Sequence, residues 1–547
     1  MFATGPGLRE QLRRHVDSGS MGTTYAEHPV VMGRAAGEVV IGFALYVDGI
    51  SFTSHDSILG IFIHILASGV RHLIVALRTS EMCGCGCRGW CSMFAIWHMI
   101  GWSIECLARG IHPTAREGGC DWRQCDSDME AFSGQPLGFK AVCVFIKNDL
   151  KELCSSLGFP AAGAHSAPCA VCIASIHDWS DVRGLTADGV RWAPHDLDRY
   201  LESAQECEVE VQLNSGTYTL VRQRLEFDKR KDGNRGRCLD SDIPALGLKK
   251  GDRLEPTPSI PSSDFFDTLR PGPGETLTAS FWRRKRETRT RHRNPLFTAG
   301  TYLSPSRSLA SDWLHCLSLG VFGYWINFVV WALVDCDAYC CRATTIDAKF
   351  SESVGFLRAS MVMWNRENKD ESLPGDLTSG MIGKRGGATS LAGAEANSML
   401  TFLVTSVLVG FRAKLLGDRW AHILKAGENL YGMLLFLRRF KGAPPRWAID
   451  DFVCMVKAFE SSATIIGLPF VPKRHSTFHL AEQCIRFGSV SASSTWRDEQ
   501  INGCLKGVAS SAHRAVWHRR VLSEFRRAYG LASAHLAGQK LHISMGA

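Results

Sequence analysis

Runs of β-branched and aromatic residues predict a sheet in the first part of the chain. The segment VVIGFALYVDG (39–49) is apolar until it ends at an Asp-Gly pair, as expected of a buried strand. Residues 50–53 and RHLIVALR (71–78) can supply two more strands, and FKAVCVFIK (139–147) a fourth. Residues 92–109 have helical length and are apolar nearly all round, which predicts a helix packed on the sheet. The expected order is strand, strand, strand, helix, strand.

The pattern changes twice further along the chain. Around 208–255, charged and apolar residues alternate in short stretches, which predicts a small β module. From 308 to 465 helical patterns dominate, interrupted by a Gly-rich loop at 373–393, and the segment 495–529 is helical and basic. These changes divide the chain into a leader without stable structure (1–37), the first part of a core (38–205), the β module (206–256), a basic linker (257–300), a helical insertion (301–470), the closing part of the core (471–530) and a tail (531–547).

One apolar stretch has roughly the length of a membrane span. Residues 317–334 (LSLGVFGYWINFVVWALV) approach the 20 or so residues that a spanning helix needs. The stretch contains Asn327 and lacks a clear cluster of flanking lysines and arginines. We therefore favour a buried core helix, while a membrane anchor stays open as the alternative. The shorter stretch 397–411 is also predicted to be a core helix.

Composition indicates a globular, intracellular protein. The chain has 547 residues, of which 45% are hydrophobic and 21% charged, so a fibrous or wholly disordered protein is excluded. Its net charge of +8 permits a polyanionic partner without demanding one. The first residues lack the pattern of a secretory signal. Twenty cysteines in a chain of this length are then expected to be reduced thiols, a few of them binding metal.

Two aspartates follow predicted strands. Asp48 ends the first strand and Asp149 the fourth, so neighbouring strand ends can bring their carboxylates together. Such a pair repels unless a divalent cation such as Mg²⁺, which prefers oxygen ligands, lies between them. Two such ions would activate a water or a 3′-hydroxyl and stabilise the leaving oxygen of a phosphodiester. Taken singly, each aspartate is better explained as part of a turn.

A third acid begins a basic helix. Asp498 and Glu499 stand near the start of the helical segment 495–520, and acidic residues at that position also serve as ordinary partners of the helix dipole. A basic helix beside an acidic site nevertheless suits a phosphate backbone, because cationic side chains neutralise phosphates. The residues predicted to contact DNA are Lys506, Arg514, Arg519 and Arg520.

A cysteine pair and a distant histidine pair can together bind one ion. Cys169 and Cys172 have the spacing of two thiolates on a tight turn, and His475 and His479 lie one helical turn apart. Two thiolates and two imidazoles are the ligands of a tetrahedral structural zinc. Each half lies beside one of the proposed acids, although the cysteines alone could be ordinary thiols. A separate group at 83–91, with Cys83, Cys85, Cys87 and Cys91, could hold a second zinc or be a reduced loop.

Several motifs, taken in order, resemble a known family. They are YVDGISF (46–52), FIKNDLKELCSSLGFP (145–160), HSAPCAVC (165–172), DWLHCLSLGVF (312–322), HSTFHL (475–480) and WRDEQINGCLKGVASSAHRAVWHRR (496–520). Over about 40–530 the chain resembles DDE transposase-like proteins of protists and, more distantly, plant CACTA-type transposases. No separate N-terminal DNA-binding finger is recognisable.

The resemblance implies a fold and a set of roles. The fold would be α/β, with a ribonuclease-H-like mixed sheet whose first three strands are antiparallel, and a large helical insertion. Asp48, Asp149 and Glu499 would bind catalytic Mg²⁺ or Mn²⁺, and the four-residue set Cys169, Cys172, His475 and His479 would bind structural Zn²⁺. A DxxH element would lie at Asp312 and His315.

The same resemblance implies how the protein acts. The expected activity is DNA transposition, with hydrolysis at element ends followed by strand transfer. The expected partners are element-end and target DNA and further copies of the chain, in the nucleus, without a membrane. The basic run 283–293 could contact phosphates, serve nuclear import or be a solvated linker. Two alternatives stay open: a DNA-binding descendant that has lost catalysis, and a membrane protein anchored through 317–334.

Overall fold

The computed structural model describes most of the chain in several segments. They are residues 20–54, 56–82, 90–159, 169–175, 177–198, 294–370, 372–411, 417–513 and 516–527, together with residues 10, 13, 14 and 200. The predicted β module (206–256), the basic run (283–293) and the tail (531–547) lie outside the described residues. So do Arg514, Cys83, Cys85 and Cys87.

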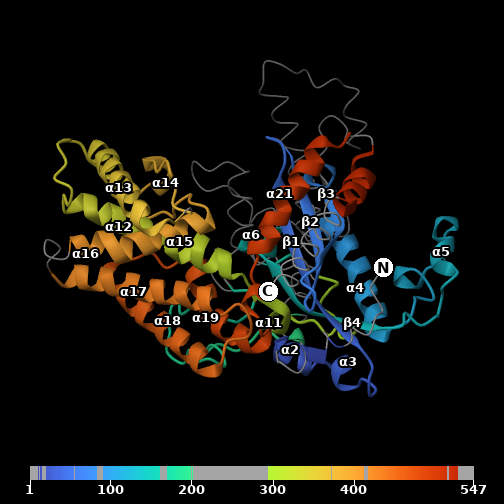
Figure 1. Cartoon of the computed structure of the whole chain (residues 1–547). Helices are drawn as coiled ribbons and strands as arrows, with labels where there is room; N and C mark the ends of the chain where they lie inside the picture. Colours follow the sequence, from blue (N-terminus) through green and yellow to red (C-terminus); the bar gives the residue numbers. More distant parts are fainter. Residues whose placement is uncertain are drawn as a thin grey trace, which may run out of the picture.

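The described part of the chain contains a mixed five-stranded sheet (Figure 1). Its strands are β1 (Val40–Ser51), β2 (Ser57–Ile65), β3 (Arg71–Arg78), β4 (Lys140–Asn148) and β5 (Leu309–Ser311). Their order across the sheet is β3-β2-β1-β4-β5. The β1–β2 and β2–β3 pairs are antiparallel, whereas β4 pairs parallel with both β1 and β5. The predictions of an α/β fold and of three antiparallel strands at the start of the sheet are therefore confirmed.

Two strands differ from the sequence-based expectation. The expected second strand at 50–53 is wrong, because β1 continues to Ser51 and the chain then turns. The turn is closed by the Asp56 backbone oxygen, which accepts from the amides of Phe52 and Thr53. The second strand is instead β2, whose run SILGIFIHI is almost wholly buried between β1 and β3. Strand β5 has only three residues, too few to produce a recognisable alternation.

Helices cover both faces of the sheet. Helix α4 (Trp90–Arg109) packs on one face, where Trp97 is fully buried and its indole N–H donates to the Ser156 oxygen. Helix α21 (Trp496–Ser511) and the helical residues 517–527 pack on the other face, against the apolar side chains of β1, β2 and β3. The described residues of the predicted closing segment (471–530) thus include helices that pack against the sheet.

The expected leader is partly folded. Within residues 20–37, α2 (Gly22–Ala26) and α3 (Pro29–Met32) form two short helices. The buried Tyr25 hydroxyl donates to the Val40 oxygen at the start of β1, 2.7 Å away. Gly22 has a φ of +71° and lies so close to the Arg486 oxygen that a Cβ there would clash. Residues 20–37 are ordered because apolar side chains such as Tyr25 pack on the sheet, which composition alone did not reveal.

The segment 294–311 belongs to the sheet layer rather than to a linker or an insertion. Asn294, Leu296 and Phe297 are fully buried, and the Asn294 backbone N–H donates to the Tyr200 hydroxyl. The expected boundaries at 257–300 and 301–470 are wrong in this part, since β5 precedes the helices. The helical insertion therefore begins after Ser311.

The insertion is a helical body beside the sheet (Figure 1). Its longer helices are α12 (Gly323–Asp335), α13 (Ile346–Asn368), α15 (Gly393–Phe402), α17 (Asp418–Arg439) and α18 (Arg446–Ile466), and α19 (Pro472–Arg486) returns the chain to the sheet. Two short helices also lie in the insertion: α14 (Ser379–Ile382) and α16 (Leu408–Gly410). Short helices elsewhere in the described residues are α5 (Ser127–Glu130), α6 (Leu150–Ser155), α11 (Pro305–Ser308) and α20 (Val490–Ser493). Two wider, π-helical segments span Leu314–Phe322 and Leu403–Val407.

The most apolar helix lies inside this body. Leu314–Asp335 is the one helix in the described ranges that is long and apolar enough to cross a membrane. Its most apolar window is 83% buried within the protein. Asn327 on this helix donates to the Ile382 and Lys384 oxygens, so its polar side chain is satisfied by the protein itself. The packing supports the interpretation of 317–334 as a core helix.

Candidate functional site

The first two predicted acids lie near each other at one edge of the sheet. Asp48 lies within β1, three residues before its end, rather than at the strand end as expected, and Asp149 directly follows β4. The parallel register of the two strands pairs Tyr46 with Lys147, and each acid comes two residues after its member of that pair. Neighbouring strands lie about 4.8 Å apart, which places the two carboxylates at one sheet edge. Asp149 is also the N-cap of α6, where its side chain accepts from the Glu152 amide at 2.7 Å. Backbone pairing in the sheet thus positions Asp48, and the beginning of α6 positions Asp149.

Asp312 connects β5 to the helix that carries the third acid. It follows β5, whose Ser311 pairs with Asn148 of β4, and it is buried. Its carboxylate accepts from the Thr495 amide at 2.8 Å and from the Thr495 hydroxyl at 2.7 Å. Since Thr495 immediately precedes α21, Asp312 anchors the beginning of that helix.

His315 lies between Asp312 and Glu499. Its Nδ1 is 2.5 Å from the Asp312 Oδ2, and its Nε2 is 3.9 Å from the Glu499 Oε1. Burial lowers the pKa of this imidazole, but the hydrogen bond and charge of Asp312, with the charges of Asp149 and Glu499, raise it overall. The predicted DxxH pair therefore faces the proposed acidic site, with Nδ1 held by Asp312 and Nε2 directed to Glu499.

The proposed acids influence one another electrostatically. Burial raises the pKa of Asp48 to about 7, with further contributions from the charges of Glu499 and Asp149 that outweigh the Tyr46 hydrogen bond. Burial also raises the pKa of Glu499, and the charges of Asp312 and Asp149 add to this shift while His315 opposes it. Negative charge at this edge is thus unfavourable without a compensating cation.

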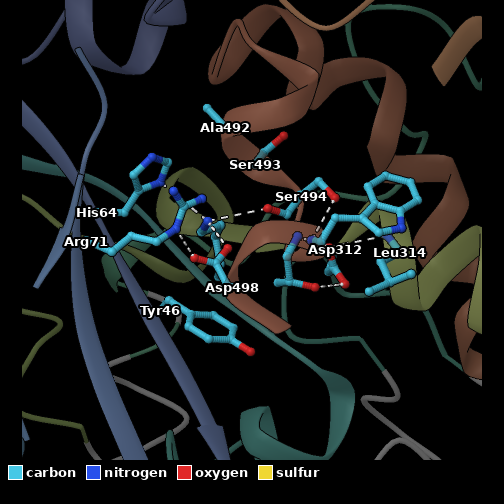
Figure 2. Close-up of polar contacts among 12 residues, drawn as sticks. Tyr46, His64, Arg71, Asp312, Leu314, Ala492, Ser493, Ser494 and Asp498 are labelled. Atoms are coloured by element: carbon cyan, nitrogen blue, oxygen red, sulfur yellow. Dashed lines mark hydrogen bonds and ion pairs between the residues drawn. The ribbon is translucent and has the colours of Figure 1, made fainter. Parts of the chain in front are cut away.

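Asp498 has a different place from Glu499, although the two are adjacent in sequence. Its buried carboxylate accepts from the Arg71 Nε at 2.5 Å and from the Lys147 ammonium (Figure 2). Lys147 also lies 3.4 Å from both the His64 Nδ1 and the Ser494 oxygen. Asp498 therefore ties α21 to strands β3 and β4 and is occupied by two cations. Glu499 is left as the residue that faces the sheet edge.

The cysteine and histidine pairs meet in space, as predicted. The Cys169 Sγ lies 3.4 Å from the His479 Nε2, and the Cys172 Sγ lies 3.4 Å from the His475 Nε2. All four ligand atoms lie within 4.8 Å of one another, and all four residues are buried. A tetrahedral zinc bound at about 2.3 Å from sulfur and about 2.0 Å from nitrogen separates such atoms by about 3.5 Å. The donor set and its spacing therefore fit a zinc ion.

Other groups orient these ligands. The His475 Nδ1 lies 2.7 Å from the Trp179 oxygen, and the His479 Nδ1 lies 2.9 Å from the Glu482 carboxylate. Such partners fix the ring so that Nε2 faces the ion. A hydrogen bond from Cys172 and the neighbouring imidazoles hold the pKa of the Cys169 thiol well below its usual range, favouring the thiolate that zinc binds.

The two proposed sites differ in how closely their ligands are gathered. Among the residues that the structure describes, the cysteine–histidine set is the group of three or more potential ligands close enough to hold an ion as they stand. Asp48, Asp149 and Glu499 lie near one edge of the sheet, and the charges of Asp149 and Glu499 raise the pKa of Asp48, but the ligand atoms of the three acids are not gathered as closely as those of the cysteine–histidine set. Carboxylate side chains would adjust around a bound cation.

The predicted DNA-contacting residues that are described lie on the surface. Lys506 is exposed on α21, and Arg519 and Arg520 are exposed on the helical residues that follow it. Their exposure leaves them available to a polyanion.

Sequence reasoning missed two residues of the acidic site. Tyr46 donates its hydroxyl to the Asp48 Oδ2 at 2.7 Å, and the Asn502 Nδ2 is 2.6 Å from the same oxygen. Two signals were present in the sequence: Tyr46 precedes Asp48 by one strand period, and Asn502 follows Glu499 by about one helical turn. Comparison with known proteins adds no further assignment: no family model, curated protein or solved structure matches the chain.

Proposed function

We propose that this protein is a DDE-type DNA transposase with a ribonuclease-H-like core. It would cut DNA phosphodiesters at element ends by hydrolysis and then join the freed 3′-hydroxyl to target DNA. The sheet order and strand directions are compatible with such a core. The observation that supports the proposal is that Asp48 and Asp149 each lie two residues beyond a parallel strand pair, with Asp149 and Glu499 close enough for their charges to raise the pKa of Asp48.

The chemistry of the acidic site suits Mg²⁺ or Mn²⁺. Carboxylate oxygens are the hard ligands that these ions prefer. Burial, and after it the negative charge of Glu499, raises the pKa of Asp48, and a bound cation would favour the ionised carboxylate against both effects. When bound, the ions would supply an activated oxygen nucleophile and stabilise the leaving oxygen. Asp48, Asp149 and Glu499 would hold them.

The remaining residues of the site would orient the acids and the DNA. Asp312 holds the start of α21 and accepts from His315, whose Nε2 could donate to a phosphate oxygen beside Glu499. Lys506, Arg519 and Arg520 would neutralise phosphates further along the duplex. The Cys169, Cys172, His475 and His479 centre would hold α19 against the loop after β4. Nuclear location and assembly of several copies are part of the same proposal.

A cleavage assay tests this function. The purified full chain would be incubated with supercoiled DNA that carries the inverted repeats flanking its coding region, with Mg²⁺ or Mn²⁺. We expect metal-dependent nicking that falls about 10²- to 10³-fold in Asp149→Asn and Glu499→Gln. Cys484→Ala, which changes a buried residue of α19 away from the acids, serves as the control and should retain activity. Nicking that is undiminished in Asp149→Asn would refute the proposal.

A further inference from the structure

Two polar residues, Tyr46 and Asn502, contact Asp48. Neither belongs to the proposed metal ligands or to the cysteine–histidine centre. Tyr46 and Asp48 lie on the same face of β1, and Asn502 reaches them from α21. The Asn502 Nδ2 is 2.8 Å from the Tyr46 hydroxyl and 2.6 Å from the Asp48 Oδ2. The Tyr46 hydroxyl in turn donates to the same Asp48 oxygen. Two neutral donors thus converge on one carboxylate oxygen.

Asn502 lies on the same helix as the other acid of this edge. Glu499 is one turn earlier on α21, whereas the Asn502 Nδ2 bonds to Asp48 of β1. One amide therefore links Asp48 of the sheet to the turn of the helix that carries Glu499. It holds the two acids in a fixed relation without adding charge to a site that already has an excess of negative charge.

The surroundings make this pair rigid. Tyr46 is 2% exposed, and its ring packs against Phe62 and lies 5.8 Å from the Lys147 ammonium. Lys147 is held in turn by Asp498, which lies near Tyr46 (Figure 2), so the buried ion cluster restrains the surroundings of the ring.

The contacts described so far use the Asn502 side-chain nitrogen and leave its carbonyl oxygen unused. Its carbonyl Oδ1 is buried and has no hydrogen-bond partner. Buried polar atoms in native proteins are almost always paired, so an unpaired amide oxygen beside two acids points to an additional ligand. An oxygen atom of this kind suits a hard cation or a water molecule of its coordination shell.

We infer that Asn502, together with Tyr46, is a positioning residue that holds Asp48 and Glu499 in the arrangement that binds a divalent cation. This inference rests on the proposed function for the identity of the site. It goes beyond that function because it assigns cation affinity to two uncharged residues. Groups that orient metal ligands in this way typically contribute about 10- to 100-fold to metal affinity or activity.

Titration of Mn²⁺ into the zinc-loaded full chain, followed by electron paramagnetic resonance, tests the inference. We expect Asn502→Leu to weaken the binding of Mn²⁺ about 10- to 100-fold, and Tyr46→Phe to weaken it by a smaller factor. Because both residues act on one oxygen, the double variant should lose less than the product of the two factors. Asn327→Leu, which removes another buried amide far from the acids, is the matched control and should bind Mn²⁺ as the unmodified protein does.

Melting temperature separates positioning from a merely structural role. A structural role for Asn502 would lower the melting temperature of Asn502→Leu and leave its Mn²⁺ affinity unchanged, and that result would overturn the inference. If Asn502→Leu does not fold, Asn502→Ser and Tyr46→Phe decide the question by the same criterion. The proposed function fails separately, if the unmodified protein binds Mn²⁺ through Asp48 but does not cut DNA.

Discussion

The Arg71 guanidinium lies 2.5 Å from the Asp498 carboxylate, in the closed interior between the sheet and α21. With Lys147 on the other carboxylate oxygen, Asp498 joins three elements that are far apart in the sequence. Asp498 and Glu499 are adjacent in the sequence but therefore lie in different surroundings. Asp498 neutralises buried cations and maintains the fold, while Glu499 faces the proposed cation site.

Replacing Asp498 and replacing Glu499 should therefore affect the free energy of unfolding differently. Asp498→Asn leaves two buried cations uncompensated and should lower the free energy of unfolding by about 3–5 kcal/mol. Glu499→Gln removes a carboxylate whose charge is unfavourable in the metal-free protein and should leave stability unchanged or slightly higher. Urea unfolding at equilibrium measures both effects. Equal stability of the two variants would show that the ion cluster has been assigned the wrong role.

The zinc centre should dominate the stability of the region around α19. Cys172→Ala removes one ligand and should release the ion, lowering the free energy of unfolding by more than about 4 kcal/mol. Cys484→Ala removes a buried thiol on the same helix that is not a ligand, and should cost only about 1 kcal/mol. Zinc content by atomic spectroscopy and thermal unfolding check both values. One zinc per chain retained in Cys172→Ala would contradict the proposed ligand set.

The contribution of Asp48 to the stability of the protein without Mg²⁺ should fall as the pH rises from about 4 to about 7. In this window folded Asp48, with a pKa of about 7, still binds a proton that the unfolded chain has lost, so proton release favours unfolding. Across the window the effect is at most about 4 kcal/mol, at 1.36 kcal/mol per pH unit. Thermal unfolding at a series of pH values measures it.

Two comparisons make this pH dependence specific to Asp48. Asp48→Asn has no carboxyl proton to release at this position, so the free energy of unfolding of this variant should change less over the same pH window. Saturating Mg²⁺ should flatten the profile of the unmodified protein, because the ion favours the ionised carboxylate. Parallel profiles for the unmodified protein and Asp48→Asn would show that Asp48 has an ordinary pKa.

The basic surface after Glu499 should give DNA binding its salt dependence. Each phosphate contact contributes about −0.9 to the slope of log affinity against log salt concentration. Lys506→Ala and Arg519→Ala should each reduce the steepness by about that amount, irrespective of DNA sequence. Arg358→Ala, an exposed charge on α13, is the matched control and should leave the slope unchanged. An unchanged slope in all three variants would place the DNA elsewhere.

Local pattern predicted the elements whose signal lies within a single segment. Strands β1, β3 and β4 and helix α4 are long, apolar runs, and each ends near the residue expected from the sequence. Strand β2 was missed because Asp56 and its turn separate it from β1 without a glycine or proline to mark the boundary. Strand β5 is stabilised by its pairing with β4, which is a long-range interaction that three residues cannot encode locally.

The clustering of the cysteine–histidine residues was predictable from the sequence, whereas the supporting residues of the acidic site were not. Cys169 and His479 were paired on the chemistry of a four-ligand zinc centre and on family resemblance, which do not depend on sequence separation. The difference between Asp498 and Glu499 depends on Arg71 and Lys147, whose side chains reach α21 only when the sheet is assembled. No local pattern contains that information.

The central claim is that Asp48, Asp149 and Glu499 bind the same cation site. Anomalous X-ray scattering from crystals of the full chain soaked in Mn²⁺ tests it most directly. We predict a manganese peak bounded by carboxylate oxygens of all three residues, which disappears in Asp149→Asn. A well-ordered site that shows no peak at saturating Mn²⁺, or a peak that excludes Glu499, would contradict the account.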